Sequence, residues 1–157
     1  MEFGPRALGN RSILADPRNP AMKDILNRRV KHREPFRPFA PAVCVEDFKD
    51  WFETHHESPF MLLSFPVRQD KRSVVPSIVH VDGSARIQTV AEPDNPVFYR
   101  LIREFGSITG VPVILNTSFN VRGEPIVCTP QDALNCFSRT EMDCLVLNRF
   151  LVTREDN

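Results

Sequence analysis

A short apolar run that ends in polar side chains constrains the fold more than any other part of the chain. Residues 111–115 read VPVIL, and the run is followed at once by Asn116, Thr117, Ser118 and Asn120. An apolar run of this length is typical of a strand. Because α/β sheets bind ligands beyond the carboxyl ends of strands, these amides and hydroxyls are candidate binding groups. The alternative is a polar turn whose Asn and Ser side chains satisfy their own backbone.

Helices and strands recur along the chain, which predicts an α/β class with a mixed sheet. The clearest helix covers residues 95–110, with Val97, Leu101, Ile102 and Phe105 expected to face inward. Shorter helices are predicted at 21–30, 46–52 and 129–140. Strands are predicted at 11–16, 40–45, 59–67, 111–116 and 144–152, and a hairpin at 77–90 around Asp82-Gly83.

The composition is that of a single globular domain. The chain has 157 residues, of which 41% are hydrophobic and 25% charged. Its apolar runs fall short of the roughly 20 residues that span a bilayer, and Glu2, Arg6 and Arg11 are unlike a signal peptide. The four cysteines show no CxxC spacing, which predicts reduced thiols and a cytoplasmic protein with no membrane association.

The net charge of zero hides an asymmetry between the two parts of the chain. Residues 1–37 hold nine Lys/Arg and four Asp/Glu, a net of +5, and the remaining 120 hold eleven and sixteen, a net of −5. The basic part contains Lys31, Arg33 and Arg37, and it favours an anionic ligand such as phosphate. The alternative is a cationic surface that pairs with the acidic remainder.

Several familiar sites are missing from the sequence. It contains neither GxxxxGK[ST] nor GxGxxG, which excludes a P-loop and gives no support to a dinucleotide site. The carboxylates form no evident pair suited to glycoside hydrolysis. His55-His56-Glu57 reads as a surface loop, so no metal site is predicted in this chain.

Four long motifs resemble one known family. They are EFGPRALGNRSILADPR at 2–18, KHREPFRPFAP at 31–41, HVDGSARIQTV at 80–90 and LNTSFNVRGEPIVCTP at 115–130. Together they look like the C-terminal domain of the O-carbamoyltransferases, which include enzymes that carbamoylate nodulation factors, cephamycin and tobramycin. The resemblance extends from residue 2 to about residue 152.

The resemblance implies a fold and a domain organisation. The family's domain is YrdC-like, a twisted open mixed β-sheet flanked by helices, with a basic concave cleft. Residues 1–157 would be one such domain, a fragment of a longer enzyme without its N-terminal domain of actin-like ATPase fold. That partner domain is metal-dependent in relatives.

The resemblance also implies a chemistry, in which carbamoyl phosphate and ATP, with Mg²⁺ as cofactor, give carbamoyl-adenylate. The N-terminal domain would then transfer the carbamoyl group to an acceptor hydroxyl. Lys31, Arg33 and Arg86 would act in catalysis. YrdC-like proteins bind nucleotide and phosphate through a KxR and an SxN motif, which here look like Lys31-His32-Arg33 and Ser118-Phe119-Asn120. With other residues of the four motifs, the residues that would bind phosphate or nucleotide are Arg6, Lys31, Arg33, Arg37, Asn116, Thr117, Ser118 and Asn120.

Three alternatives remain at this point. YrdC-like clefts have been likened to RNA-binding grooves. A nucleic-acid partner is nevertheless not expected, because the chain is neutral and has one Trp and one Tyr for stacking. A non-catalytic cap on the N-terminal domain would show an exposed apolar patch and no nucleotide affinity. The related threonylcarbamoyl-adenylate synthases use bicarbonate and threonine, and the four motifs match them less well.

Overall fold

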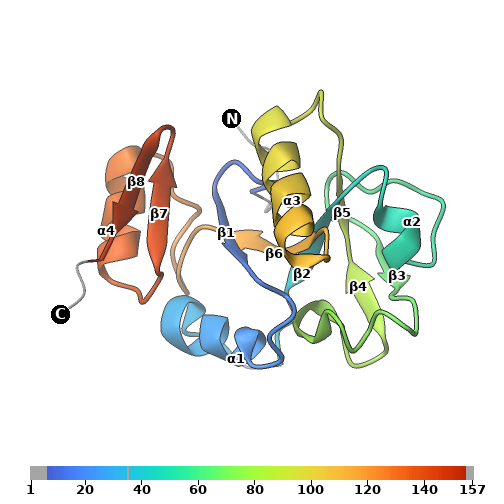
Figure 1. Cartoon of the computed structure of the whole chain (residues 1–157). Helices are drawn as coiled ribbons and strands as arrows, with labels where there is room; N and C mark the ends of the chain where they lie inside the picture. The colour runs from blue at the N-terminus through green and yellow to red at the C-terminus, as the bar shows by residue number, and fades with distance from the viewer. Residues whose placement is uncertain (1–6, 35, 155–157) are drawn as a thin grey trace.

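A mixed four-stranded sheet organises the chain (Figure 1). In the computed structural model, which describes residues 7–34 and 36–154, its strand order is β1-β6-β2-β5. The strands are β1 (Ser12–Ala15), β6 (Val113–Ser118), β2 (Ala40–Cys44) and β5 (Gln88–Val90). Strand β6 is antiparallel to both β1 and β2, whereas β2 and β5 are parallel. The predicted α/β class with a mixed open sheet is confirmed.

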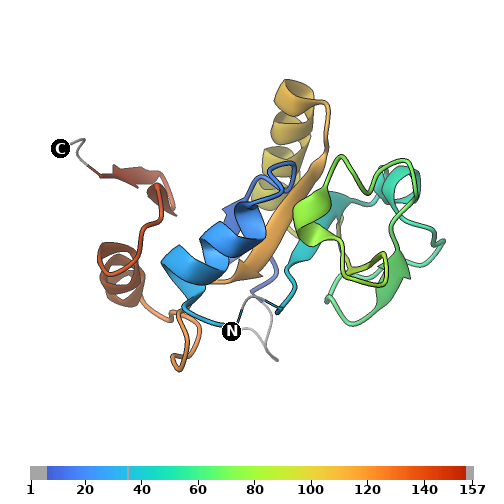
Figure 2. The same cartoon turned by 90° about the horizontal axis from the view of Figure 1, so that it is seen from below.

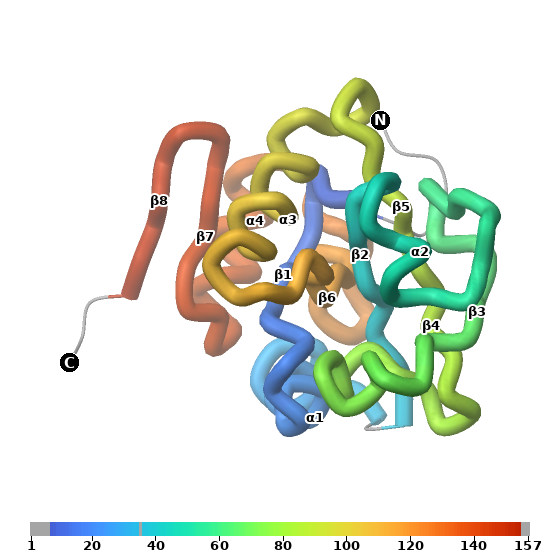
Figure 3. The backbone as a smooth tube through the Cα atoms, turned by 45° about the vertical axis from the view of Figure 1, so that its right-hand side comes forward, coloured from blue at the N-terminus to red at the C-terminus, as the bar shows by residue number. Residues whose placement is uncertain are grey.

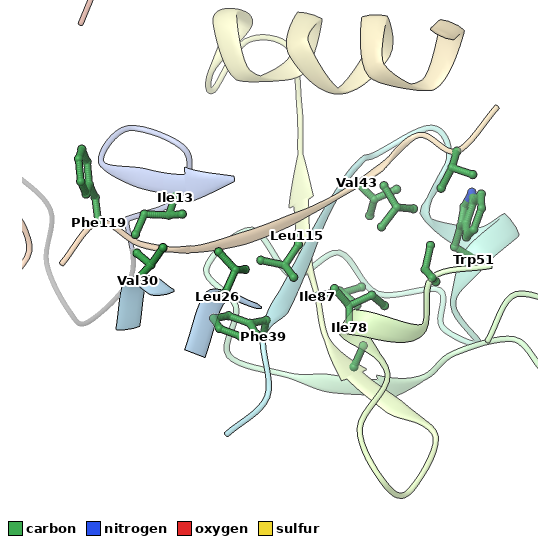
Figure 4. Packing of buried hydrophobic residues seen from close by; sticks show 14 of the residues in the cluster. Ile13, Leu26, Val30, Phe39, Val43, Trp51, Ile78, Ile87, Leu115 and Phe119 are labelled. Carbon is green, nitrogen blue, oxygen red and sulfur yellow. The ribbon is translucent and has the colours of Figure 1, made fainter. Parts of the chain in front are cut away.

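Strand β6 lies at the centre of this sheet because its residues are buried on both faces. Val113 and Leu115 belong to the larger hydrophobic cluster, and Ile114, which points the other way, belongs to a second, smaller one. The larger cluster also contains Leu26 and Val30, which lie across β6 from helix α3 (Pro96–Thr109) (Figure 4). The view from below shows β6 between helix α3 and the helical segment at 22–31 (Figure 2).

Helix α3 (Pro96–Thr109) covers one face of the sheet, as predicted. Asn95 Oδ1 accepts a hydrogen bond from Phe98 N–H at 3.1 Å, and Gly110 ends the helix at a φ of 75°. The predicted inward face was partly wrong, because Val97 and Leu101 are 73% and 46% exposed. Phe98 and Ile102 form the buried line instead, so the helix is rotated by about one residue from the predicted orientation.

On the other face, helix α1 (Met22–Leu26) continues into a π turn over Asn27–Lys31. Helix α2 (Phe48–Trp51) and a 3-10 turn (Pro76–Ile78) add Phe48, Trp51 and Ile78 to the same cluster. These positions agree with the helices predicted at 21–30 and 46–52. Helix α4 (Pro130–Ser138) also matches its prediction, and a capping box between Thr129 and Asp132 begins it.

The strand predicted at 59–67 is formed only at its end. Residues 59–67 yield only the short strand β3 (Ser64–Pro66), because Met61 adopts a φ of 54° that interrupts an extended chain. Phe60, Leu62 and Leu63, expected to be buried, are exposed.

The hairpin predicted at 77–90 is not formed, although its turn is present. Asp82 Oδ1 accepts a hydrogen bond from Ser84 N–H at 2.9 Å, but Pro76 begins a 3-10 turn where the first strand was expected. Strand β4 (Ser84–Arg86) pairs with β3 instead, and the chain crosses at the fully buried Ile87 into β5 of the central sheet.

The last segment, β7 (Cys144–Leu147) and β8 (Phe150–Thr153), forms a separate antiparallel hairpin beside α4 (Figure 3). All four cysteines are free; Cys44 and Cys136 are buried, and Cys128 and Cys144 are exposed. No helix in the described part of the chain is both long and apolar enough to cross a membrane.

The central position of β6 generates a stability prediction. Leu115→Ala should lower the free energy of unfolding by about 2–5 kcal/mol, because it leaves a cavity in a packed cluster. Leu62→Ala is the matched control, since Leu62 is 74% exposed and its loss should cost under about 0.5 kcal/mol. Urea denaturation of both variants checks this; equal midpoints would contradict the assigned core.

Candidate functional site

The amine of Lys31 lies against the end of β6, so the structure brings together the two segments that the sequence singled out. Lys31 Nζ donates to Asn120 Oδ1 at 2.9 Å and to the Asn120 carbonyl at 3.0 Å. It also contacts the Ser118 carbonyl and lies 3.3 Å from Ser118 Oγ. Because Lys31 is only 4% exposed, these four oxygens replace its hydration.

The local backbone explains why Lys31 points inward. The π turn ends at His32, whose φ of 48° turns the chain out of the helix and leaves Lys31 on the buried side. On the other segment, Ser118 Oγ donates to Asn120 Oδ1 at 2.7 Å, and Asn120 Nδ2 donates to the Glu124 carbonyl at 2.8 Å. The three side chains therefore form one hydrogen-bonded network.

Burial lowers the pKa of Lys31 from its ordinary value of 10.5 to about 7. The nearby Arg33 guanidinium acts in the same direction, because a second positive charge disfavours the ammonium form. Cys136 acts in the opposite direction and raises the pKa of Lys31.

Next to this network lies a small pocket of about 90 Å³. It is formed where the end of β6 meets the start of β2 and the end of β4. Its lining residues are Ala7, Arg33, Pro38, Phe39, Ala40, Met61, Arg86, Asn116, Thr117 and Ser118.

Arg33 is held firmly at the pocket wall. Its Nε donates to Asn27 Oδ1 at 2.8 Å, and its guanidinium lies 4.5 Å from the centre of the Phe39 ring. Burial is the main cause that lowers the pKa of Arg33, and repulsion from Arg37 and Arg86 acts in the same direction. Arg33 stays charged at neutral pH, because an arginine is not deprotonated in proteins.

Arg86 ends β4 and lines the same pocket as Arg33. A guanidinium is a planar donor that matches the oxygens of phosphate or carboxylate. Two such groups in one small pocket, with no carboxylate among the described residues that line it, favour an anionic ligand.

Asn116 adds an amide to the pocket. It is 1% exposed, and its Nδ2 donates to Gln88 Oε1 at 2.7 Å. Its Oδ1 is buried and has no hydrogen-bond partner among the described residues. Gln88 is 4% exposed and lies on β5, opposite Ala42 of β2. Its side chain therefore holds that of Asn116 across the intervening strand β2.

The structure separates the predicted site residues into three groups. Arg33, Arg86, Asn116, Thr117 and Ser118 line the pocket; Lys31 and Asn120 lie in the network beside it. Arg37 is exposed and pairs with Glu34 at 3.1 Å. Arg6 lies outside the described residues.

Sequence reasoning missed Asn27, Gln88 and Met61. Asn27 and Gln88 orient pocket residues, and the only available signal for Gln88 was its place in the motif at 80–90. Met61 lines the pocket and has a positive φ, a backbone conformation that its residue type does not predict.

The lowered pKa of Lys31 predicts a pH dependence of stability. Between pH 7 and 10.5 the unfolded chain keeps a proton on this lysine that the folded chain has released, so stability rises with pH across this window. Relative to Lys31→Met, the wild-type free energy of unfolding should therefore increase with pH, by at most about 1.4 kcal/mol per unit.

Chemical denaturation of both proteins from pH 6.5 to 10 checks the prediction. Both proteins carry the same remaining titratable groups, so the difference between them isolates the contribution of Lys31. A difference that does not change with pH would contradict the lowered pKa.

Comparison with known proteins adds an independent observation. Residues 1–154 match the family described as Carbamoyltransferase C-terminus. An uncharacterized protein of Synechocystis sp. is 51% identical over 98% of this chain and 28% of its own length. The nodulation protein NolNO of Sinorhizobium fredii is 49% identical over 98% of this chain and 23% of its length. The 3'-hydroxymethylcephem-O-carbamoyltransferase of Amycolatopsis lactamdurans is 44% identical over 92% of this chain and 28% of its length.

The chain thus spans about a quarter of the length of these relatives, at identities far above those that leave a family in doubt. The match extends over nearly all of the chain, including every segment that forms the pocket. The chain belongs to the carbamoyltransferase C-terminal family, whose relatives include nodulation proteins and cephem O-carbamoyltransferases.

Proposed function

We propose that this domain activates the carbamoyl group for an O-carbamoyltransferase. It would bind ATP and carbamoyl phosphate and form carbamoyl-adenylate, which an N-terminal domain of the same polypeptide would use to carbamoylate an acceptor hydroxyl. The family membership supports the reaction class, and the name of the cephem relative, an O-carbamoyltransferase of a hydroxymethyl group, supports a hydroxyl as acceptor.

The observation that carries the proposal is the convergence of Arg33, Arg86 and Asn116 on one pocket. Its volume of about 90 Å³ is well below the roughly 300 Å³ at which pockets for drug-sized ligands begin. It therefore suits a carbamoyl or phosphate group rather than a whole nucleotide. The adenosine part of ATP would lie outside it.

The proposed chemistry has two steps. Hydrolysis of carbamoyl phosphate gives carbamate and inorganic phosphate. A carbamate oxygen then attacks the α-phosphorus of ATP, the bond to the β-phosphate oxygen breaks, and pyrophosphate leaves with the electron pair. Arg33 and Arg86 would stabilise the charge that develops on the phosphate oxygens.

Lys31 and Asn120 would act beside the reacting groups. Their network fixes the end of β6, and with it the positions of Thr117 and Ser118 at the pocket wall. The described residues contain no group of three His, Cys, Asp or Glu placed to hold a metal ion. Mg²⁺ would therefore be held by the triphosphate and water. The pocket would then belong to the basic concave cleft of a YrdC-like sheet.

One observation favours a second candidate function, that of a cap on the rest of a longer enzyme. Val97, Leu101 and Ile108 lie along one side of α3 and are 73%, 46% and 83% exposed. Apolar side chains spaced in this way are typical of a helix face that a neighbouring domain covers. A cap of this kind has no affinity for nucleotide, which separates it from the adenylation role.

Calorimetric titration with ATP and with AMP tests the proposal. Arg33→Met and Arg86→Met should each weaken ATP binding at least about tenfold, because a hydrogen bond to a charged group contributes about 1.5–3 kcal/mol. Arg149→Met is the matched control, since Arg149 is exposed in the turn between β7 and β8 and should leave affinity unchanged.

Release of pyrophosphate from ATP, dependent on carbamoyl phosphate, is the second readout. A folded wild-type protein that binds neither nucleotide would contradict the adenylation role and favour the cap. Binding that all three variants retain would place the nucleotide elsewhere. RNA binding that weakens steeply with salt and is unaffected by ATP would instead indicate a nucleic-acid module.

A further inference from the structure

The pocket contains a group that phosphate recognition does not explain, the side-chain oxygen of Asn116. We propose that Asn116 Oδ1 accepts a hydrogen bond from the NH₂ of carbamoyl phosphate and so distinguishes a carbamoyl group from other small acyl groups. The inference rests on the proposed function, because it assigns a role to one residue of the same pocket.

The first argument is the state of this oxygen. Asn116 is 1% exposed, and its Oδ1 is without a hydrogen-bond partner among the described residues. A buried acceptor that stays unsatisfied is costly, and nearly all such groups in folded proteins are paired. Since Asn116 lines the pocket, a molecule bound there can supply the missing donor.

The second argument is the orientation of the amide. Asn116 Nδ2 donates to Gln88 Oε1 at 2.7 Å, and Gln88 is itself buried at 4% exposure. This contact uses the amide nitrogen and leaves the oxygen without a partner among the described residues. Gln88 is therefore a positioning residue. It orients Asn116 so that the amide oxygen is left to accept a hydrogen bond from an N–H or O–H group of the ligand.

The third argument is the contrast with the neighbouring groups. Arg33 and Arg86 line the same pocket, and a guanidinium offers donors and no acceptor. They suit the anionic oxygens of a ligand but not an N–H. The pocket thus combines donors for an anion with a buried acceptor, which fits a small molecule that carries both a phosphate and a primary amide.

Acetyl phosphate provides a close probe, because a methyl group replaces the NH₂ at nearly the same size. A site built to hydrogen-bond an N–H rejects the analogue that lacks it, since its own polar group is then left unpaired. Wild-type protein should therefore bind freshly dissolved carbamoyl phosphate at least about tenfold more tightly than acetyl phosphate. Inorganic phosphate should bind more weakly than carbamoyl phosphate.

Three variants locate the preference by calorimetric titration of the full chain. Asn116→Leu should abolish it, making the two affinities equal within about twofold. Asn116→Asp retains an acceptor, so it should keep the preference although both anions bind less tightly. Thr117→Val removes the neighbouring hydroxyl of the same pocket and should keep the preference.

The outcomes separate the two levels of the argument. If wild-type protein binds both acyl phosphates equally, Asn116 does not recognise the amide, and the proposed function stands. Loss of the preference in Thr117→Val but not in Asn116→Leu would also overturn the assignment to Asn116. If water alone satisfies the Asn116 oxygen, the two acyl phosphates should bind with equal affinity, which is the first of these outcomes. If neither acyl phosphate binds, the proposed function itself fails.

Discussion

The buried contact between the Lys31 amine and the end of β6 is the interaction on which the site depends. It joins two segments separated by 87 residues in the chain. An amine at 4% exposure is costly to bury unless oxygens surround it, and here Ser118 and Asn120 supply all four. The contact therefore fixes how the π turn after α1 sits against the central strand.

The positions of the pocket residues follow from this arrangement. Arg33 comes two residues after Lys31, and Asn27, in the same π turn, directs its guanidinium over Phe39. Ser118 and Asn116 lie on the strand that Lys31 holds, and β4 brings Arg86 from the small sheet. The segment after the π turn, strand β4 and strand β6 thus place two arginines and one asparagine around the same small pocket. This arrangement supports the proposed ligand, which carries an anionic and an amide group.

Much of the fold could be predicted from the sequence where local signals agreed with the final packing. The helix at 96–109 was found from its apolar pattern. The strand predicted at 111–116 was found from its apolar run, and it lies at 113–118. Residues 59–67 failed because an apolar run resembles a buried strand, whereas here Met61 turns the chain and its neighbours face solvent. The hairpin at 77–90 failed although its turn signal was genuine, because a 3-10 turn replaces its first strand. Its second strand is divided between two sheets, with β4 paired to β3 and β5 paired to β2.

The sequence by itself determined the family, the class of fold, and the two motifs that meet around Lys31, because these depend on residue types in a fixed order. Only the tertiary structure decided which of those residues face the pocket. Lys31 and Asn120 hydrogen-bond to each other, and Arg37 pairs with Glu34 at the surface. Asn116 lines the pocket, and its nitrogen donates to Gln88 while its oxygen has no partner among the described residues. The physical reason is that hydrogen-bonding capacity is limited, and its distribution depends on neighbours that lie far apart in the chain.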